Sequence, residues 1–204
     1  MAKTQREIFQ ATMAHEPHDG FLFYASFTKH CDERVRCRHQ LGDDADLRSF
    51  FGMFKPAAVG MRAPQDTSWE PDFSAYYDDI EIPEGAGIDH HGVMKIPTGY
   101  YHFRRMVSPL RNAASFEDIA AFPFPDMAGF TEEHMASQVQ EAHAAGRVVK
   151  GRVGHMYETA WQIRGYEQFL EDTMLRPEWC EYILDRLMEE NIRKAEAAAR
   201  AGAD

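Results

Sequence analysis

RVVKGRVG, residues 147–154, is a short β-rich segment that leads directly into a helical pattern. That pattern covers residues 159–175, and a second helix is predicted at residues 177–200, with proline in its first turn. On the N-terminal side, residues 131–146 predict a helix with Thr131 as its N-cap and Gly146 as its terminator. Such an order of helix, strand and helix is typical of a parallel sheet with helical crossovers.

The N-terminal part of the chain repeats this alternation. Residues 57–61, AAVGM, predict a buried strand. Residues 21–27, FLFYASF, predict another, because an almost wholly apolar run is typical of a strand buried on both faces. Helices are predicted at residues 5–14, 32–42 and 44–52. The three predicted strands therefore indicate an α/β fold, with either an open sheet or a closed barrel.

Residues 62–125 depart from this alternation. They are rich in Trp, Tyr, Pro and Gly, a composition that favours short strands joined by turns. We therefore expect a hairpin-like excursion, ending in a short helix with Ser115 as its cap and Asp118 at its third position. Residues 1–204 are expected to form a single domain, in which residues 1–19 are the N-terminal helix and turn and residues 131–204 hold the third strand with its flanking helices.

The charge and composition exclude several classes of partner. The 204 residues include 33 acidic and 22 basic side chains, and the resulting net charge of −11 repels phosphate backbones, so we expect no nucleic-acid partner. No run approaches the roughly 20 apolar residues that span a bilayer, and the start lacks the apolar core of a secretory signal. We therefore expect a cytoplasmic protein without a membrane partner. The three cysteines are too few for a disulfide framework.

Three stretches, in order along the chain, resemble the uroporphyrinogen decarboxylase superfamily, which includes zinc-dependent methyltransferases that act on corrinoid proteins. REIFQATMAHEPHDGFLFY, residues 6–24, is similar to its opening helix, H-x-x-P-D turn and first strand. VSPLRNAASFEDIAAFPFPD, residues 107–126, resembles its S-x-E-D-I and P-x-P-D segment. VVKGRVGHMYETAWQIRGYEQFLEDTMLRPE, residues 148–178, resembles its third strand and the helix after it, in which R-G-x-E-x-x-L-x-D recurs. The resemblance covers essentially the whole chain.

The resemblance implies the N-terminal part of a (β/α)8 TIM barrel, with about three of its eight strands. It also implies that a fourth strand follows AGAD, residues 201–204. Three strands alone would leave an open sheet edge and an uncovered apolar face. Self-association, or pairing with a complementing half-barrel, is therefore expected.

The loops after the predicted strands depart from the decarboxylase pattern that the resemblance implies. Where the decarboxylases carry an arginine loop after the first strand, this chain has Lys29 and His30 as the candidate substrate contacts. Arg62 stands where they place an aspartate, and Trp161 falls at the position of a tyrosine in the third loop. These departures disfavour uroporphyrinogen decarboxylation. Arg104, in the excursion, is a further candidate contact for an anionic substrate.

The resemblance therefore favours a methyltransferase-like enzyme of corrinoid-dependent one-carbon metabolism, with a small molecule or a corrinoid protein as its substrate. Methyltransferases of the family hold zinc through a His-x-Cys and a later Cys, which the resemblance places beyond residue 204, so no cofactor is expected within this chain. One alternative is the decarboxylation of uroporphyrinogen or another acid. The other is a non-catalytic half-barrel that binds a partner.

GHMYE, residues 154–158, holds the catalytic candidates. This stretch follows a predicted strand, so His155, Tyr157 and Glu158 are expected at the mouth of the barrel. His155 and Glu158 are three residues apart, a spacing that suits an acid–base pair or a pair of ligands on one helical face. The alternative is that Glu158 caps the following helix and His155 is only a hydrogen-bonded neighbour.

Two histidine-containing stretches have competing interpretations. HCDERVRCRH, residues 30–39, offers side chains that zinc prefers, but helical spacing points Cys37 and His39 apart, so we expect a buried Cys37 and a solvated His39. DHHGVMKIPTGYYHFRRMV, residues 89–107, is either a lid whose arginines meet an anionic ligand or an aromatic hairpin that packs on the fold. Its alternation of aromatic and charged residues favours the hairpin.

Overall fold

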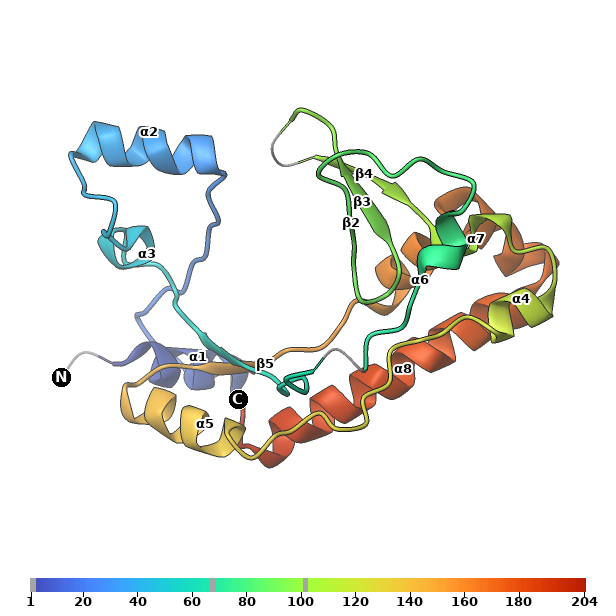
Figure 1. Cartoon of the computed structure of the whole chain (residues 1–204). Coiled ribbons are helices and arrows are strands. Elements are labelled where there is room, and N and C mark those ends of the chain that lie inside the picture. The colour runs from blue at the N-terminus through green and yellow to red at the C-terminus, as the bar shows by residue number, and fades with distance from the viewer. Residues whose placement is uncertain (1–2, 67–68, 101–102) are drawn as a thin grey trace. The chain divides into compact units, whose positions relative to one another are not determined.

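The chain folds as a mixed α/β protein that contains two compact units. The computed structural model describes residues 3–66, 69–100 and 103–204 (Figure 1). Unit 1 comprises Met1–Gly60, Glu132–Arg152 and Ala197–Asp204, and unit 2 comprises Met61–Thr131 and Val153–Glu196. Each unit is therefore assembled from segments that are far apart in the sequence.

The sheet of unit 1 consists of two parallel strands. β1, Ala57–Val59, pairs with β5, Val149–Gly151, so that Ala57 lies opposite Val149 and Val59 opposite Gly151. Helix α5, Met135–Ala144, packs against both strands, and its Val139 is buried. Two of the predicted strands and their parallel pairing through a helical crossover are thus confirmed.

The third predicted strand, residues 21–27, is wrong. No strand is assigned to these residues, and the hydrogen bond described for their backbone runs from the Phe54 N–H to the Phe23 carbonyl, at 2.8 Å. Phe21 is 84% exposed, and Tyr24 is also exposed. An apolar run favours burial but does not supply a pairing partner, and the two-stranded sheet of unit 1 does not extend to this segment.

Unit 1 contains three more helices: α1, Gln5–Met13; α2, Lys29–His39; and α3, Leu47–Phe50. A capping box between Thr4 and Glu7 starts α1. None of the described residues of α2 is buried, so the prediction of a buried Cys37 is wrong: the thiol is exposed. The His39 ring packs near the rings of Phe50 and Phe51, with centroids 5.2 and 5.9 Å apart, and this contact does not cover Cys37.

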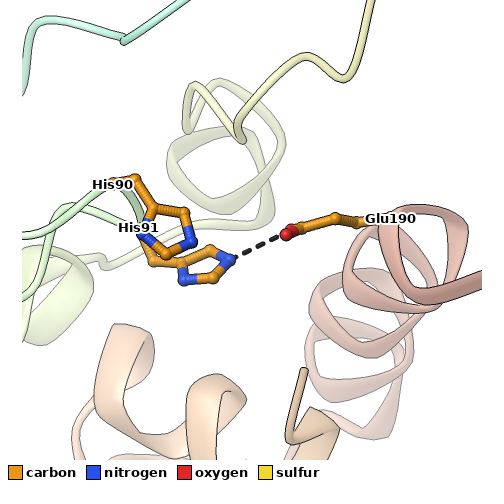
Figure 2. Close-up of side chains that lie close together, drawn as sticks. All are labelled: His90, His91 and Glu190. Carbon is orange, nitrogen blue, oxygen red and sulfur yellow. Dashed lines mark hydrogen bonds and ion pairs between the residues drawn. The ribbon is translucent and has the colours of Figure 1, made fainter. Parts of the chain in front are cut away.

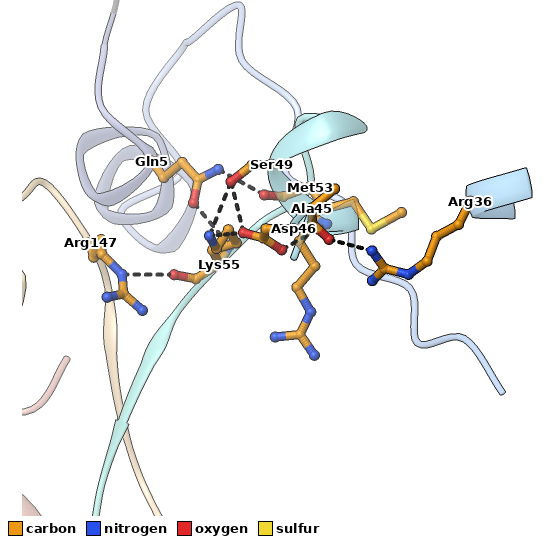
Figure 3. A network of polar contacts seen from close by, with 9 residues as sticks. Gln5, Arg36, Ala45, Asp46, Ser49, Met53, Lys55 and Arg147 are labelled. Carbon is orange, nitrogen blue, oxygen red and sulfur yellow. Dashed lines mark hydrogen bonds and ion pairs between the residues drawn. The ribbon is translucent and has the colours of Figure 1, made fainter. Parts of the chain in front are cut away.

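A polar network ties the start of β1 to the helices of unit 1 (Figure 3). Lys55 forms an ion pair with Asp46 and donates to the Ser49 hydroxyl at 3.1 Å. The Gln5 side chain donates to the Met53 carbonyl and accepts from the Lys55 N–H, each at 3.0 Å. These bonds satisfy backbone groups that precede the strand and fix its entry.

The predicted excursion is a three-stranded antiparallel sheet in unit 2. Its strands are β2, Gly87–Ile88; β3, Met94–Pro97; and β4, Arg104–Val107, in the order β2-β3-β4. The hairpin interpretation of residues 89–107 is thereby confirmed for the described part of that stretch; Tyr101 and His102 lie outside the described residues.

Two 3-10 helices flank this sheet: η1, Ser74–Tyr77, and η2, Pro109–Asn112. The buried Tyr77 hydroxyl donates to the Val107 carbonyl at 3.0 Å and accepts from the Met94 N–H at 3.2 Å. Burial raises the pKa of Tyr77 to about 12, so the phenol stays protonated and its hydrogen bonds persist at neutral pH.

The remaining helices of unit 2 follow the predicted order, with one break. They are α4, Phe116–Ala120; α6, Met156–Arg164; α7, Tyr166–Leu175; and α8, Pro177–Arg200, whose last turn belongs to unit 1. The predicted helix at residues 159–175 is interrupted at Gly165, which has φ 105°, a backbone conformation that a side chain disfavours. The predicted Thr131 cap is also wrong, since α5 starts after His134 and Thr131 pairs with Arg62 in an antiparallel bridge.

Candidate functional site

The three predicted catalytic residues lie at the start of α6, after the end of β5 in the chain. His155 is the N-cap residue of α6 and is exposed. Tyr157 is 53% exposed, and its ring makes an edge contact with Phe169, with centroids 5.8 Å apart. Glu158 accepts a hydrogen bond from Gln162 at 3.1 Å. Three polar side chains thus share one helix start with access to solvent.

Within the described chain, no hydrogen bond or ion pair joins His155 to Glu158, and neither side chain caps α6. The trio therefore has the exposure that a binding site needs but not the contact of a formed acid–base pair. Hydrogen bonds between catalytic side chains are often long in the free enzyme and tighten in the substrate complex.

Among the described residues, no hydrogen bond or ion pair joins the predicted substrate contacts of unit 2 to one another. Arg62 is exposed, and its backbone exchanges two hydrogen bonds with Thr131, at 2.9 and 3.0 Å. Arg104 is exposed on β4, opposite Pro97. Trp161 is partly buried against the core, and its ring meets the Tyr166 ring edge-on with centroids 5.5 Å apart.

The predicted contacts of unit 1 lie on the first turn of α2. The Lys29 side chain is 83% exposed, and its ammonium group lies 4.0 Å from the Glu33 carboxylate. His30 is exposed beside it. An exposed pair of this kind contributes little to stability, so Lys29 remains accessible to an anionic ligand.

The three cysteines fall into two groups, two exposed on α2 and one buried. Cys31 and Cys37 are exposed on α2, whereas Cys180 is buried in unit 2 and donates from its thiol to the Phe169 carbonyl. Residues 1–204 contain no His-x-Cys sequence. Among the described residues, those of HCDERVRCRH do not converge as a metal-binding group either.

A different group of ligand-type side chains does converge in unit 2. His90 and His91 occupy the middle of the turn between β2 and β3, and Glu190 projects toward them from α8 (Figure 2). The His91 Nε2 lies 3.0 Å from the Glu190 Oε2, and the two histidine rings have centroids 4.0 Å apart. One ligand atom from each of the three residues lies within 4.8 Å of the others.

The backbone of the turn is fixed by Asp89. Its carboxylate accepts from the N–H groups of His91 and Val93, each at 3.0 Å, and its carbonyl accepts from the Gly92 N–H at 2.8 Å. Gly92 has φ 77°, the left-handed conformation that closes a three-residue hairpin loop. Both histidines are consequently carried on a turn whose backbone is held by hydrogen bonds to Asp89.

The Glu190 carboxylate is ionised. Burial alone would raise its pKa, but hydrogen bonds from His91 and Lys194 outweigh burial and lower the pKa of Glu190 to about 2. Although His90 is exposed, the atoms packed around its ring disfavour the charged form and, together with the nearby His91, lower the pKa of His90 below its ordinary value. A neutral imidazole and an ionised carboxylate are the forms of these side chains that bind metal ions.

Glu190 was missed as a site residue, although the sequence holds a signal for it. The buried residues Ile183 and Leu187 and the later Ala197 mark the apolar face of α8, and Glu190 falls on that same face. A buried acidic residue on an apolar face requires a partner, which here lies 99 residues earlier in the chain. The sequence therefore indicates that Glu190 needs a partner but does not identify His91 as that partner.

Comparison of the chain with protein-family models, curated proteins and solved structures found no match. The resemblance to the uroporphyrinogen decarboxylase superfamily accordingly rests on the quoted motifs alone. Among the described residues, no helix has both the length and the apolar character required to cross a membrane.

Proposed function

We propose that this chain contributes to a (β/α)8 barrel enzyme of the uroporphyrinogen decarboxylase type, with a methyltransferase-like role in corrinoid-dependent one-carbon metabolism. The parallel pairing of β1 with β5 around the α5 crossover is the observation that carries the proposal. This is the repeating unit of such a barrel, and polar residues that follow its strands are the expected place for chemistry. His155, Tyr157 and Glu158 follow β5 in the order of the chain.

The edge of β5 that faces away from β1 gives further support. The Ala57 N–H of β1 donates to the Val148 carbonyl, so the neighbouring Val149 carbonyl points to the opposite edge. There it accepts from the Asp204 N–H at 2.9 Å, and the Val149 N–H donates to the Asp204 carboxylate at 2.9 Å. The backbone at Asp204 thus lies along the edge where a barrel places the next strand.

In the proposed reaction, a thiol substrate loses its proton to the His155 imidazole, and the thiolate attacks the methyl carbon of a methyl-corrinoid substrate. A sulfur–carbon bond forms, the carbon–cobalt bond breaks, and its electron pair stays on cobalt. Glu158 and Tyr157 orient the two substrates. The residues of this chain do not form the zinc set of the family, so no step is assigned to a metal.

The test is a methyl-transfer assay. The protein is incubated with methylcobalamin and a series of thiols, and loss of the methylcobalamin absorbance is followed together with thioether formation by mass spectrometry. We expect His155→Gln to slow transfer by about 100-fold or more, since general-base catalysis contributes at least that factor. Tyr157→Phe should also slow transfer, whereas Tyr166→Phe, at a tyrosine of similar exposure (54% against 53%), should not.

Parallel reactions with uroporphyrinogen separate the alternatives. Decarboxylated porphyrin products without methyl transfer would replace the proposal with the decarboxylase function. Failure to turn over either substrate would instead favour a non-catalytic half-barrel that binds a partner.

A further inference from the structure

We propose that His90, His91 and Glu190 form a binding site for one divalent transition-metal ion of the zinc class. The group lies entirely within unit 2, and its three donors come from the β2–β3 turn and from α8. This proposal is independent of the proposed methyl-transfer function, because none of its residues has a role in the proposed methyl transfer.

The donor set suits zinc. Two imidazole nitrogens and one carboxylate oxygen are a combination used by zinc sites that keep a further position open for water. Ligand atoms about 2.1 Å from one ion lie about 3 to 3.5 Å apart. His91 and Glu190 already have that spacing, at 3.0 Å between Nε2 and Oε2. All three ligand atoms lie within 4.8 Å of one another, and His90 is the exposed member of the group.

The site has one rigid part and one accessible part. The side chains of His91 and Glu190 are only 13% and 8% exposed, and the turn that carries His91 is fixed by Asp89. His90 is exposed, so an ion reaches the group from solvent on that side. Because His91 and Glu190 are already held in place, little conformational entropy is lost when an ion binds.

The charges around the group set its affinity. Lys194 forms an ion pair with the Glu190 Oε1, which leaves Oε2 facing His91. The Asp89 carboxylate adds a second negative charge near the turn but is paired with Lys95 at 2.8 Å. Lys194 therefore opposes a bound cation, and its removal should strengthen metal binding.

A purely structural ion pair is the competing explanation. In that case His91 and Glu190 stabilise the contact between the turn and α8, and His90 has no part in it. The two explanations differ in their predictions for His90 and Lys194. Only a metal site predicts that His90→Gln weakens zinc binding and that Lys194→Gln strengthens it.

The experiment uses the full chain without an affinity tag, in a Cys31→Ser, Cys37→Ser background that removes the exposed thiols of α2. Zinc binding is measured by competition with a chromophoric chelator, and cobalt(II) binding by its visible absorption spectrum. We expect one ion per chain, and a loss of affinity of at least about 10-fold in each of His90→Gln, His91→Gln and Glu190→Gln. Circular dichroism checks that each variant is folded.

His143→Gln is the matched control. The His143 Nε2 lies 2.8 Å from the Asp204 carboxylate, like the pair in the proposed site, but no third ligand from the described chain joins them. This variant should bind zinc as tightly as its parent. An unchanged affinity in folded His90→Gln and Glu190→Gln would overturn the proposal, and so would the absence of stoichiometric binding in the parent protein.

Discussion

At the scale of single residues, a buried ion pair organises unit 2. The Arg164 Nε lies 2.7 Å from the Asp172 Oδ2, and both side chains are almost fully buried. Arg164 also donates to the Leu110 carbonyl and lies over the Trp179 ring. Arg164 and Asp172 are the first and last residues of the R-G-x-E-x-x-L-x-D stretch, so these two residues of that motif stabilise the fold rather than contact a substrate.

Breaking this pair should unfold unit 2 more easily. Asp172→Ala leaves a buried guanidinium without its carboxylate, and we expect the free energy of unfolding to fall by about 3–5 kcal/mol. Urea denaturation followed by tryptophan fluorescence measures the change. The double variant Arg164→Met, Asp172→Leu should recover much of the loss, because it removes both charges; a double variant as unstable as Asp172→Ala would contradict this account.

The three cysteines should differ sharply in reactivity. Burial raises the pKa of the Cys180 thiol to about 11, so very little thiolate forms at neutral pH, whereas Cys31 and Cys37 are exposed. Iodoacetamide at pH 8 should therefore modify Cys31 and Cys37 in the native protein and reach Cys180 only after denaturation. Peptide mass spectrometry measures the labelling, and rapid native labelling of Cys180 would show that its burial is wrong.

At the scale of elements, the contact between α3 and β1 should weaken in acid. Hydrogen bonds from Lys55 and then Ser49 lower the pKa of Asp46 to about 2. A carboxyl group with a lowered folded pKa stabilises the protein above its unfolded pKa, near 4, and this stabilisation is lost as the pH falls through about 2. The difference in stability between the parent and Asp46→Asn should thus shrink from pH 5 to pH 2.

Urea titrations of both proteins across that range test the expectation. Asp126→Asn, in unit 2, serves as a control that removes a carboxylate outside this network. A difference between the parent and Asp46→Asn that stays constant with pH would exclude a role for the Asp46 charge.

Elements with local signals were predictable from the sequence. The capping box of α4, made by Ser115 and Asp118, is formed as expected, and α8 has the predicted bounds, Pro177–Arg200. Interactions within three or four residues decide such features. Residues 21–27 failed because a strand depends on a distant partner, and apolar composition carries no information about whether that partner is present.

The candidate sites show the same contrast between local and distant interactions. The exposed positions of His155, Tyr157 and Glu158 after a strand were predictable from local order along the chain. The approach of Glu190 to His91 was not, because it depends on how a hairpin turn packs against a helix 99 residues later. Contacts of that kind are determined by tertiary packing rather than by periodicity.

At the scale of the whole molecule, Asp204 connects distant parts of unit 1. Its carboxylate binds the Arg6 guanidinium at 2.9 Å, the His143 ring at 2.8 Å and the Val149 N–H at 2.9 Å. These contacts lower the pKa of Asp204 despite burial that opposes the shift. One side chain therefore joins α1, α5 and β5.

Removing this connection should loosen unit 1 selectively. Asp204→Ala leaves the Val149 N–H without its acceptor, so we expect its hydrogen exchange to accelerate about 10-fold, since a lost buried hydrogen bond costs about 1–3 kcal/mol. Exchange at the Met94 N–H, in unit 2, should remain unchanged. Hydrogen-exchange NMR measures both rates, and equal acceleration in the two units would show that they open together.

The division of α8 between the units also has a consequence for protein synthesis. Unit 1 contains the first sixty residues but also needs Ala197–Asp204, so it cannot be completed until the ribosome has made unit 2. At about 5–20 residues per second, the N-terminal segment waits about 7–30 seconds for its last partner. During that interval Arg6, His143 and the Val149 N–H lack the Asp204 carboxylate that binds them in the finished unit, so α1, α5 and β5 are joined through it only after Asp204 is made.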